Sequence, residues 1–414
     1  MIRILMLGMH RFPHGDAPSN RMLAMARSFA EAGCAPYVVG NGVPDQRYRV
    51  GTDLYVVDGV PFTTVRDRRD RTLHRALARI FQTLALARAA RRGGTKDAAL
   101  IYVTHSTVTL GLTLLCRLVW RRPLLIDCTE WHEPSQFRWG RLSPQYLRFA
   151  YRFRFLCRGH VIGITRAICA ELSRRGNQVV RIPPQVDMTH FAPHGPLAAT
   201  RIELFYGGSA RGKDDLGTAL RGLMLLTPDE RSRFRFTIAG PSRTEISELV
   251  GGDEPLQALE QTVNVIGRVS RDEVLRRLAQ AHFTVLLRPV SRYSAAGFPS
   301  KIPESLAAGT PPLVNLTSDL ADHLADGYNA VVVDDCSAEA FAAAARRVLT
   351  LDEDQLDRMS RAASDTARSQ FDCRAWADAS RVLISQITGT QLGPDPRTGA
   401  TRHMSGTSSQ HRAG

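Results

Sequence analysis

Short runs of apolar, often β-branched residues alternate with longer segments whose apolar positions recur at helical spacing, and this alternation occurs twice along the chain. The first set of runs comprises residues 2–7, 37–40, 100–104, 124–127 and 161–165. The second set comprises residues 202–206, 234–239, 263–266, 283–287, 312–315 and 330–333. Alternation of this kind predicts parallel sheets built from βαβ units. We therefore expect two α/β domains of comparable size, which suits a length of 414 residues.

A proline-rich passage at residues 182–193 separates the two sets and marks the boundary between the domains. We expect an amino-terminal domain of residues 1–190 and a carboxyl-terminal domain of residues 191–375. A last helix at residues 376–387 is expected to pack back toward the amino-terminal domain. Residues 388–414 lack periodicity and are rich in small and polar residues, which predicts a disordered tail.

Composition limits the class of protein. A hydrophobic content of 43% with 23% charged residues is typical of soluble globular proteins. Seven cysteines scattered singly indicate a reducing compartment and argue against structural zinc. The apolar run at residues 1–8 is too short for a signal peptide, and residues 107–120 are too short to span a bilayer, so we expect a buried helix there. These features favour a cytoplasmic protein.

The net charge of +14 is concentrated in the amino-terminal half. Residues 66–92 hold nine arginines with apolar positions at helical spacing, and residues 138–158 interleave six arginines with six aromatic residues. Such segments can lie on anionic lipid headgroups at the inner face of a membrane. Nucleic acid is a weaker competing partner because no recognised nucleic-acid-binding pattern is present. A merely solvated arginine face also stays open.

The segment 296–311 bears most directly on function. Gly297 makes a turn before a helix, with Ser300 as a candidate N-cap and Lys301 at the helix start. Backbone N–H groups at such a turn attract anions such as a diphosphate, and Lys301 adds a full positive charge. Glu304 follows one turn later and can accept hydrogen bonds from sugar or ribose hydroxyls. An ordinary capped helix is the alternative without function.

This segment resembles the donor-binding motif of retaining glycosyltransferases of the GT-B fold, family four. Glu304 matches the second of two glutamates in that motif, while Ala296 stands where the first is expected. The resemblance implies two Rossmann-like domains facing each other across a cleft. It also implies retaining transfer of a sugar from a UDP- or GDP-linked donor to an acceptor hydroxyl, without a metal or other cofactor. The donor-binding residues implied in this segment are Gly297, Phe298, Pro299, Ser300, Lys301 and Glu304.

Further segments match the family in order along residues 1–387. Arg211 and Lys213 take the approximate places of a basic pair that neutralises the leaving diphosphate, with Ser209 in the same loop. The resemblance also implies that Arg268 and Val269 lie beside the nucleobase of the donor. It implies that Gly15 and Asp16, in the glycine-rich loop after the first strand, contact the donor as well.

His132, just beyond the run 124–127, matches a family histidine near the donor sugar. We expect its ring to hydrogen-bond a sugar hydroxyl, with Glu130 or Glu133 fixing the tautomer. His105 is a rival candidate. A zinc site at His132 is disfavoured because no second histidine lies at ligand spacing.

Two other functional classes stay open. The alanine at position 296 suggests a catalytically silent GT-B scaffold protein, and a sugar-nucleotide epimerase of GT-B architecture would share the donor site. An NAD-linked enzyme is disfavoured because the chain lacks the Gly-x-Gly-x-x-Gly fingerprint. The basic, aromatic amino-terminal half favours a lipid-linked acceptor, as in assembly of cell-surface polysaccharide or glycolipid.

Overall fold

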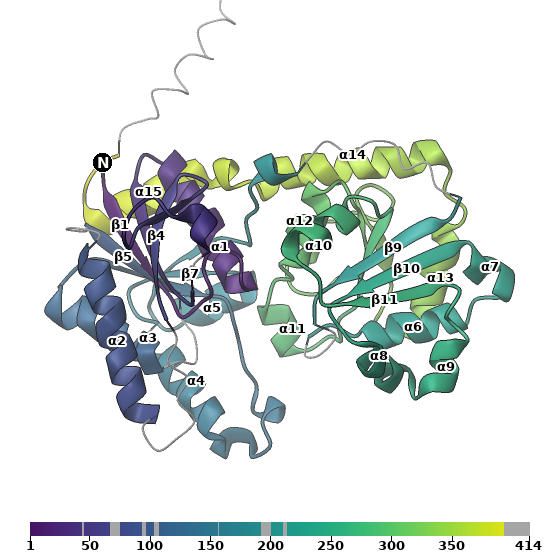
Figure 1. Ribbon diagram of the computed structural model, residues 1–414, viewed down its shortest axis with the longest axis horizontal. Coiled ribbons are helices and arrows are strands. Elements are labelled where there is room, and N and C mark those ends of the chain that lie inside the picture. Colours follow the sequence, from purple (N-terminus) through teal and green to yellow (C-terminus); the bar gives the residue numbers. More distant parts are fainter. Residues whose placement is uncertain are drawn as a thin grey trace, which may run out of the picture.

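The computed structural model describes residues 1–43, 45–66, 75–92, 97–102, 107–155, 157–191, 200–209 and 213–392. Within these residues the chain forms two α/β domains that lie side by side, each built on one sheet (Figure 1). The prediction of two α/β domains with largely parallel sheets is therefore confirmed. Residues 393–414 of the expected tail lie outside the described residues.

The first sheet has eight strands in the order β3-β4-β2-β1-β5-β6-β7-β8, and only the β3–β4 pair is antiparallel. Its strands are β1 (Arg3–Leu7), β2 (Ala35–Asn41), β3 (Tyr55–Val57), β4 (Val60–Val65), β5 (Ala98–Tyr102), β6 (Leu124–Cys128), β7 (His160–Gly163) and β8 (Gln178–Arg181). The β3–β4 hairpin, absent from the sequence prediction, turns at Asp58 and Gly59 with φ values of 48° and 76°. Positive φ at both central residues is typical of a two-residue hairpin turn.

Helices cover both faces of this sheet because alternate strand residues point to opposite sides. Ile4 and Met6 of β1 pack against α1 (Ala17–Glu31) and α15 (Ala377–Thr388). Leu5 and Leu7 belong instead to the apolar cluster of α2 (Arg75–Arg92), α3 (Thr107–Leu114) and α5 (Arg166–Ser173). The chain thus returns to the amino-terminal domain at its end, where α15 follows α14 (Glu353–Gln370) along the top of Figure 1.

The second sheet has six parallel strands in the order β11-β10-β9-β12-β13-β14. Its strands are β9 (Ile202–Gly207), β10 (Phe234–Ala239), β11 (Val263–Gly267), β12 (Phe283–Leu286), β13 (Pro312–Asn315) and β14 (Val331–Val333). One face is covered by α6 (Leu216–Met224), α8 (Arg243–Val250) and α13 (Ala338–Val348). On the other face lie α10 (Arg271–Leu278), α12 (Lys301–Ala307) and α14. Shorter helices are α7 (Pro228–Ser232), α9 (Asp253–Gln257) and α11 (Arg292–Ala296).

The two domains share an apolar contact. Ile164 and Ile168 on the amino-terminal side belong to the same buried cluster as Ala296, Phe298 and Ile302 on the carboxyl-terminal side.

Close to this contact, the chain crosses between the domains twice. The Val186 N–H donates to the carbonyl of Phe371 at 2.9 Å, and the Cys373 N–H donates to the carbonyl of Val186 at 2.8 Å. The two crossings therefore run together as a paired hinge.

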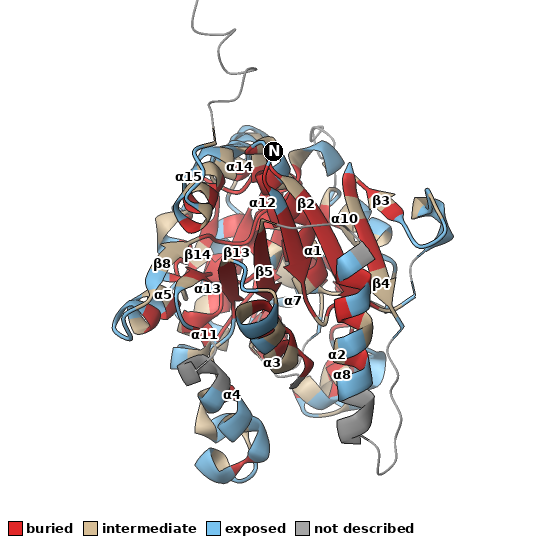
Figure 2. Ribbon diagram, turned by 90° about the vertical axis from the view of Figure 1, so that its left-hand side faces the viewer, coloured by how far each residue is buried: buried red, intermediate tan, exposed pale blue. Residues whose placement is uncertain are grey.

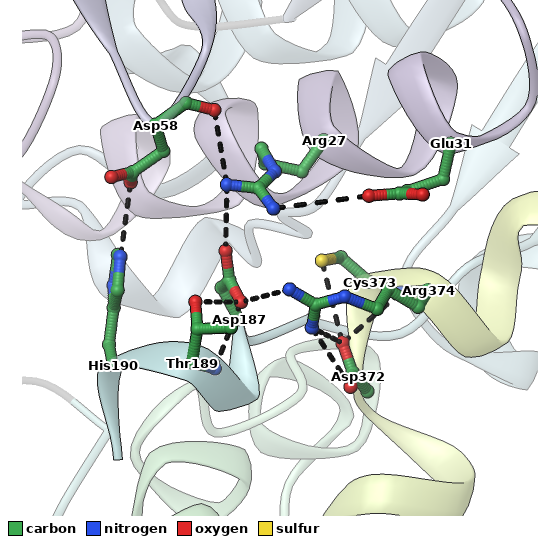
Figure 3. A network of polar contacts seen from close by, with 9 residues as sticks. All are labelled: Arg27, Glu31, Asp58, Asp187, Thr189, His190, Asp372, Cys373 and Arg374. Atoms are coloured by element: carbon green, nitrogen blue, oxygen red, sulfur yellow. Dashed lines mark hydrogen bonds and ion pairs between the residues drawn. The ribbon is translucent and has the colours of Figure 1, made fainter.

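Charged side chains surround this hinge (Figure 3). Asp187 lies 3.1 Å from the guanidinium of Arg27 on α1 and 3.0 Å from that of Arg374 in η7 (Cys373–Trp376). His190, in η5 (Met188–His190), lies 3.2 Å from the carboxylate of Asp58. The turn of the β3–β4 hairpin is thereby tied to the linker between the domains.

The His190–Asp58 pair should make stability depend on pH. Its hydrogen bond with Asp58 raises the pKa of His190 above the ordinary value of about 6.5. A raised pKa in the folded state stabilises the fold at low pH, and this contribution is lost as the pH rises through the raised pKa. Urea unfolding at a series of pH values should therefore show a steeper loss of stability above pH ~6.5 in the native protein than in His190→Gln. Parallel curves would refute the contribution.

The expectation of a buried helix at residues 107–120 is wrong for one side of that segment. Helix α3 continues into a π-helical turn, η2 (Leu115–Val119). Leu112 of α3 and Cys116 of η2 are buried, while Leu118 and Val119 of η2 are exposed. Only the side of the segment toward the sheet is covered. Among the described residues, none of the helices combines the length and apolar character that crossing a bilayer requires.

Candidate functional site

Three charged side chains meet beyond the carboxyl ends of the neighbouring strands β9 and β12. Asp214 follows β9, Arg288 follows β12, and Lys301 begins α12. The Asp214 carboxylate accepts hydrogen bonds from Lys301 and from Arg288, the latter at 2.8 Å. Burial alone would raise the pKa of Asp214, but Lys301 and Arg288 lower it, so the carboxylate stays ionised. Ligands of open parallel sheets bind at this edge.

Glycine lets the lysine reach this position. The Lys301 ammonium lies 3.1 Å from the Tyr206 hydroxyl and 4.3 Å from the centre of its ring. A Cβ atom at Gly208 would overlap the end of the Lys301 side chain, and the φ of 144° at Gly208 is unfavourable for other residues. The backbone after β9 and the lysine are therefore fitted to each other.

Lys213 lies at the same edge and has no counterion among the described residues. Its ammonium is 4.3 Å from the centre of the Tyr293 ring and lies against the backbone of Gly297. Among the residues that the structure describes, no carboxylate lies within ion-pairing distance of Lys213. Burial lowers the pKa of this ammonium, and the more distant Glu130 carboxylate opposes the shift only in part. A partly buried cation without a partner favours an anion beside it.

His132 brings the amino-terminal domain to this edge. Its Nδ1 lies 3.1 Å from Gln136 Oε1, and its Nε2 lies 3.4 Å from a Glu130 oxygen. The His132 ring is 5.8 Å from the ring of Tyr293, which also contacts the Lys213 ammonium. The predicted residues His132 and Lys213, from different domains, are thus joined through one tyrosine. No role for Tyr293 followed from the sequence.

Glu304 faces a different part of the interface. Its carboxylate lies 2.8 Å from the guanidinium of Arg271, and both residues line a cavity of about 30 Å³ between the domains. His14 and Asn20 line this cavity from the amino-terminal domain, and Gln185 lines it from the linker. Lys301 and Glu304 therefore serve different parts of the interface, although they lie one helical turn apart.

Several predicted donor-site residues have structural roles here. Asp16 caps α1 by accepting hydrogen bonds from the backbone N–H and hydroxyl of Ser19 at 3.0 and 2.6 Å. Gly15 packs closely against Arg11 in the turn before that helix. Phe298 is buried against Phe371, with ring centres 5.8 Å apart.

Other predicted residues lie around the edge of the site. The carbonyl of Ser209 accepts the Tyr206 hydroxyl at 2.6 Å, and the carbonyl of Gly297 accepts from Arg288 at 3.2 Å. Pro299 is buried, Arg268 is exposed and Val269 is partly buried.

The prediction of Ser300 as a side-chain N-cap is wrong, because its backbone is already helical and its side chain makes no capping bond. Arg211 and His105 lie outside the described residues.

Comparison with known proteins adds to this geometry. Residues 195–366 match the family profile described as glycosyl transferases group 1. HepE of Anabaena, solved with UDP and glucose, superposes with a TM-score of 0.66 at 14% identity, covering 93% of this chain and 100% of that one. Sucrose-phosphate synthase of Thermosynechococcus elongatus gives 0.66 at 15% identity, with 94% and 100% covered. No curated protein matches the sequence.

This chain has the GT-B fold. An α,α-trehalose-phosphate synthase (UDP-forming) of Burkholderia vietnamiensis superposes over a similar extent, with a TM-score of 0.62 at 12% identity and coverage of 94% and 100%. Identities this low carry the fold and not the substrate. The region similar to glycosyl transferases group 1 contains Lys213, Asp214, Arg288, Lys301 and Glu304.

Position 296 of this GT-B protein is buried. Ala296 is 2% exposed within the apolar contact between the domains, and its carbonyl accepts a hydrogen bond from the Thr165 hydroxyl at 2.9 Å. We therefore predict that Ala296→Glu lowers the midpoint of thermal unfolding, because a carboxylate would be buried among apolar side chains. Ala296→Ser is the matched control. An unchanged midpoint in Ala296→Glu would mean that the protein accepts a carboxylate there.

The described residues contain one cluster with metal-ligand spacing, formed by Asp187, Asp372 and Cys373 beside the hinge. Arg374 lies 3.0 Å from both carboxylates, and Arg27 also pairs with Asp187. Burial raises the pKa of the Cys373 thiol to about 12, which disfavours the thiolate that metals bind. The arginines already neutralise these groups, so we assign them to the hinge network of Figure 3.

Proposed function

We propose that this GT-B protein is a glycosyltransferase that moves a sugar from a nucleotide-sugar donor to an acceptor hydroxyl with retention of anomeric configuration. The observation that carries the proposal is the ammonium of Lys213, a cation without a carboxylate partner among the described residues, at the carboxyl ends of the second sheet. A sugar diphosphate supplies the missing anion. The group 1 profile over residues 195–366 and the UDP complex of HepE support this assignment.

The two lysines stabilise the leaving group in this proposal. As the bond between the anomeric carbon and the phosphate oxygen breaks, negative charge accumulates on the nucleoside diphosphate, and Lys213 and Lys301 offset it. The acceptor oxygen bonds to the same face of the sugar, and its proton passes to the departing phosphate oxygen. No pair of catalytic carboxylates is needed, unlike in glycoside hydrolysis. The alanine at position 296 is compatible with this chemistry, and we propose that it needs no metal ion.

We further propose that the acceptor is lipid-linked and that the reaction belongs to cell-surface polysaccharide or glycolipid assembly at the cytoplasmic face of a membrane. His132 hydrogen-bonds a hydroxyl of the donor sugar in this scheme. Its ring packs 5.1 Å from that of Phe149 on α4 (Pro144–Phe155). This basic, aromatic helix supports placing a lipid-borne acceptor on the His132 side of the cleft.

Nucleotide release from a panel of UDP- and GDP-sugars, measured with and without EDTA, tests the proposal. Release that requires an acceptor supports transfer, whereas donor interconversion without an acceptor would identify the epimerase alternative. No turnover and weak nucleotide binding would identify the scaffold alternative. Lys301→Ala and Glu304→Ala should both lower release, and unaltered release in both would reject the site. Abolition of release by EDTA would overturn the metal-free chemistry.

Binding of the nucleoside diphosphate should weaken with rising pH. Burial holds the pKa of Lys213 below its ordinary value, and only the protonated ammonium attracts the diphosphate. Affinity is therefore lost as the pH rises through this lowered pKa, earlier than for an exposed lysine. Isothermal titration of UDP and GDP at several alkaline pH values measures the effect, and Lys213→Arg should reduce it because arginine stays protonated. A pH-independent affinity in the native protein would contradict this role.

A further inference from the structure

We infer that one end of the amino-terminal domain docks on a bilayer that contains anionic phospholipid. This docking end comprises residues 80–84 of α2, residues 114–122 around η2, and residues 138–151 from η4 (Gly140–Leu142) into α4. Figures 1 and 2 both place α2, α3 and α4 at the same end of the domain, opposite α14 and α15. In Figure 2, α4 extends beyond the sheet and is mostly exposed or intermediate.

Large apolar side chains are exposed on all three parts of the docking end. Leu118 is 71% exposed, Trp139 66% and Leu142 79%. The others that are exposed there are Ile80, Phe81, Leu84, Leu114, Val119, Leu147 and Tyr151. Helix α2 packs on the domain through Leu86 and its later turns, whereas Ile80, Phe81 and Leu84 are left uncovered. Single exposed apolar residues are ordinary, but gathering of this kind marks an interaction surface.

The charge of this end suits an anionic surface. Its exposed cations, with those that flank it, are Arg121, Arg122, Arg138, Arg141, Arg148 and Arg158. The sequence contains no aspartate or glutamate at residues 98–126 or 134–170, so few groups oppose this positive charge. Arginine near a membrane surface gains about 1 kcal/mol from anionic lipid, whereas exposed leucine and valine gain by entering the acyl region.

The mixture of side chains distinguishes a bilayer from nucleic acid. Nucleic acid would use the arginines and aromatic rings, but aliphatic residues such as Leu118, Val119 and Leu142 gain nothing from a phosphate backbone. A helix that lies in the interface with apolar and arginine side chains together is typical of peripheral membrane binding. The aliphatic exposure therefore favours lipid.

Docking would bring the bilayer close to the proposed site. The buried ring of Phe149 on α4 contacts Trp131 and His132 at 5.7 and 5.1 Å, while Leu147 and Tyr151 of the same helix are exposed. One helix thus forms a wall beside His132 and an outer face for lipid. The delivery of a lipid-borne acceptor to His132 rests on the proposed function, but the docking itself does not.

Flotation of the full-length chain with vesicles tests the docking. The protein should float with vesicles of phosphatidylcholine and phosphatidylglycerol and much less with phosphatidylcholine alone. Arg138→Gln with Arg141→Gln should weaken partitioning about 25-fold, from about fivefold for each arginine. Leu142→Ser with Leu147→Ser should weaken it at least about tenfold. The matched control is Val382→Ser with Arg361→Gln, on α15 and α14, where both residues are exposed and partitioning should not change.

Several results would overturn the inference. These are no flotation with either vesicle, equal loss in the control variant, or docking-end variants that float like the native protein. Binding of a labelled oligonucleotide that needs the same arginines, without vesicle binding, would assign the surface to nucleic acid. Donor turnover measured without lipid should be the same in Leu142→Ser as in the native protein. If the proposed function is wrong, the native protein will show no donor turnover but will still float with anionic vesicles. Failure of the proposed function is therefore distinguishable from failure of the docking.

Discussion

Lys213→Met is expected to lower the rate of nucleotide release from the preferred nucleotide-sugar about 100- to 1000-fold, with little effect on folding. The loss follows from removing a preorganised charge from the leaving diphosphate. Folding should be spared because Lys213 has no ion-pair partner among the described residues, and methionine keeps an apolar stem beside the ring of Tyr293. Steady-state kinetics and thermal unfolding of the same preparation measure both effects.

Two further variants separate the effect of the Lys213 charge from the effect of its side-chain shape. Lys213→Arg keeps the charge and should retain much more activity than Lys213→Met. Tyr293→Phe keeps the ring that contacts the ammonium and should have only a small effect. Equal turnover in the native protein and Lys213→Met would remove Lys213 from the donor site.

Asp214→Ala is expected to lower the free energy of unfolding by about 3–5 kcal/mol. The Asp214 side chain is 7% exposed and neutralises both Lys301 and Arg288, so its removal leaves two cations without their shared carboxylate. The neighbouring Asp215 supplies a matched control, since it caps α6 by accepting the Thr218 N–H at 3.0 Å. Asp215→Ala should cost about 1 kcal/mol, the usual value for an N-cap.

Urea unfolding of the two variants measures this difference. The double variant Asp214→Ala with Lys301→Met should be less unstable than the sum of its single changes, because one unpaired cation is gone. Loss of stability in Asp214→Ala that is no larger than in Asp215→Ala would show that the ion pairs contribute little.

The strands of both sheet centres could be predicted because they are buried on both faces and form continuous apolar runs. The edge strand β8 and the β3–β4 hairpin were missed. Residues of β8 are exposed or partly buried, and β3 has only three residues, so neither forms a strong apolar run. Residues Asp58 and Gly59 are a turn signal that could have indicated the hairpin. The exposed side of η2 was missed because periodicity does not tell whether a partner covers an apolar face.

Sequence motifs mark Lys213 and Lys301, which the structure places at one edge of the second sheet, and Glu304, which lies in another part of the interface. The partners of Lys301 could not be predicted, because Asp214 meets Arg288 and Lys301 only through the packing of β9 beside β12. One signal was available. The chain has 54 lysines and arginines, of which only Lys96, Lys213 and Lys301 are lysines, and two of these three lie at the candidate site.

A crystal structure with UDP or GDP bound, chosen by the donor that the protein turns over, tests the central claim most directly. We predict that the diphosphate lies beside the ammonium of Lys213, next to the backbone of Gly208 and Gly297, with Lys301 on its other side. A nucleotide bound away from these residues, or a diphosphate that faces neither lysine, would contradict the account.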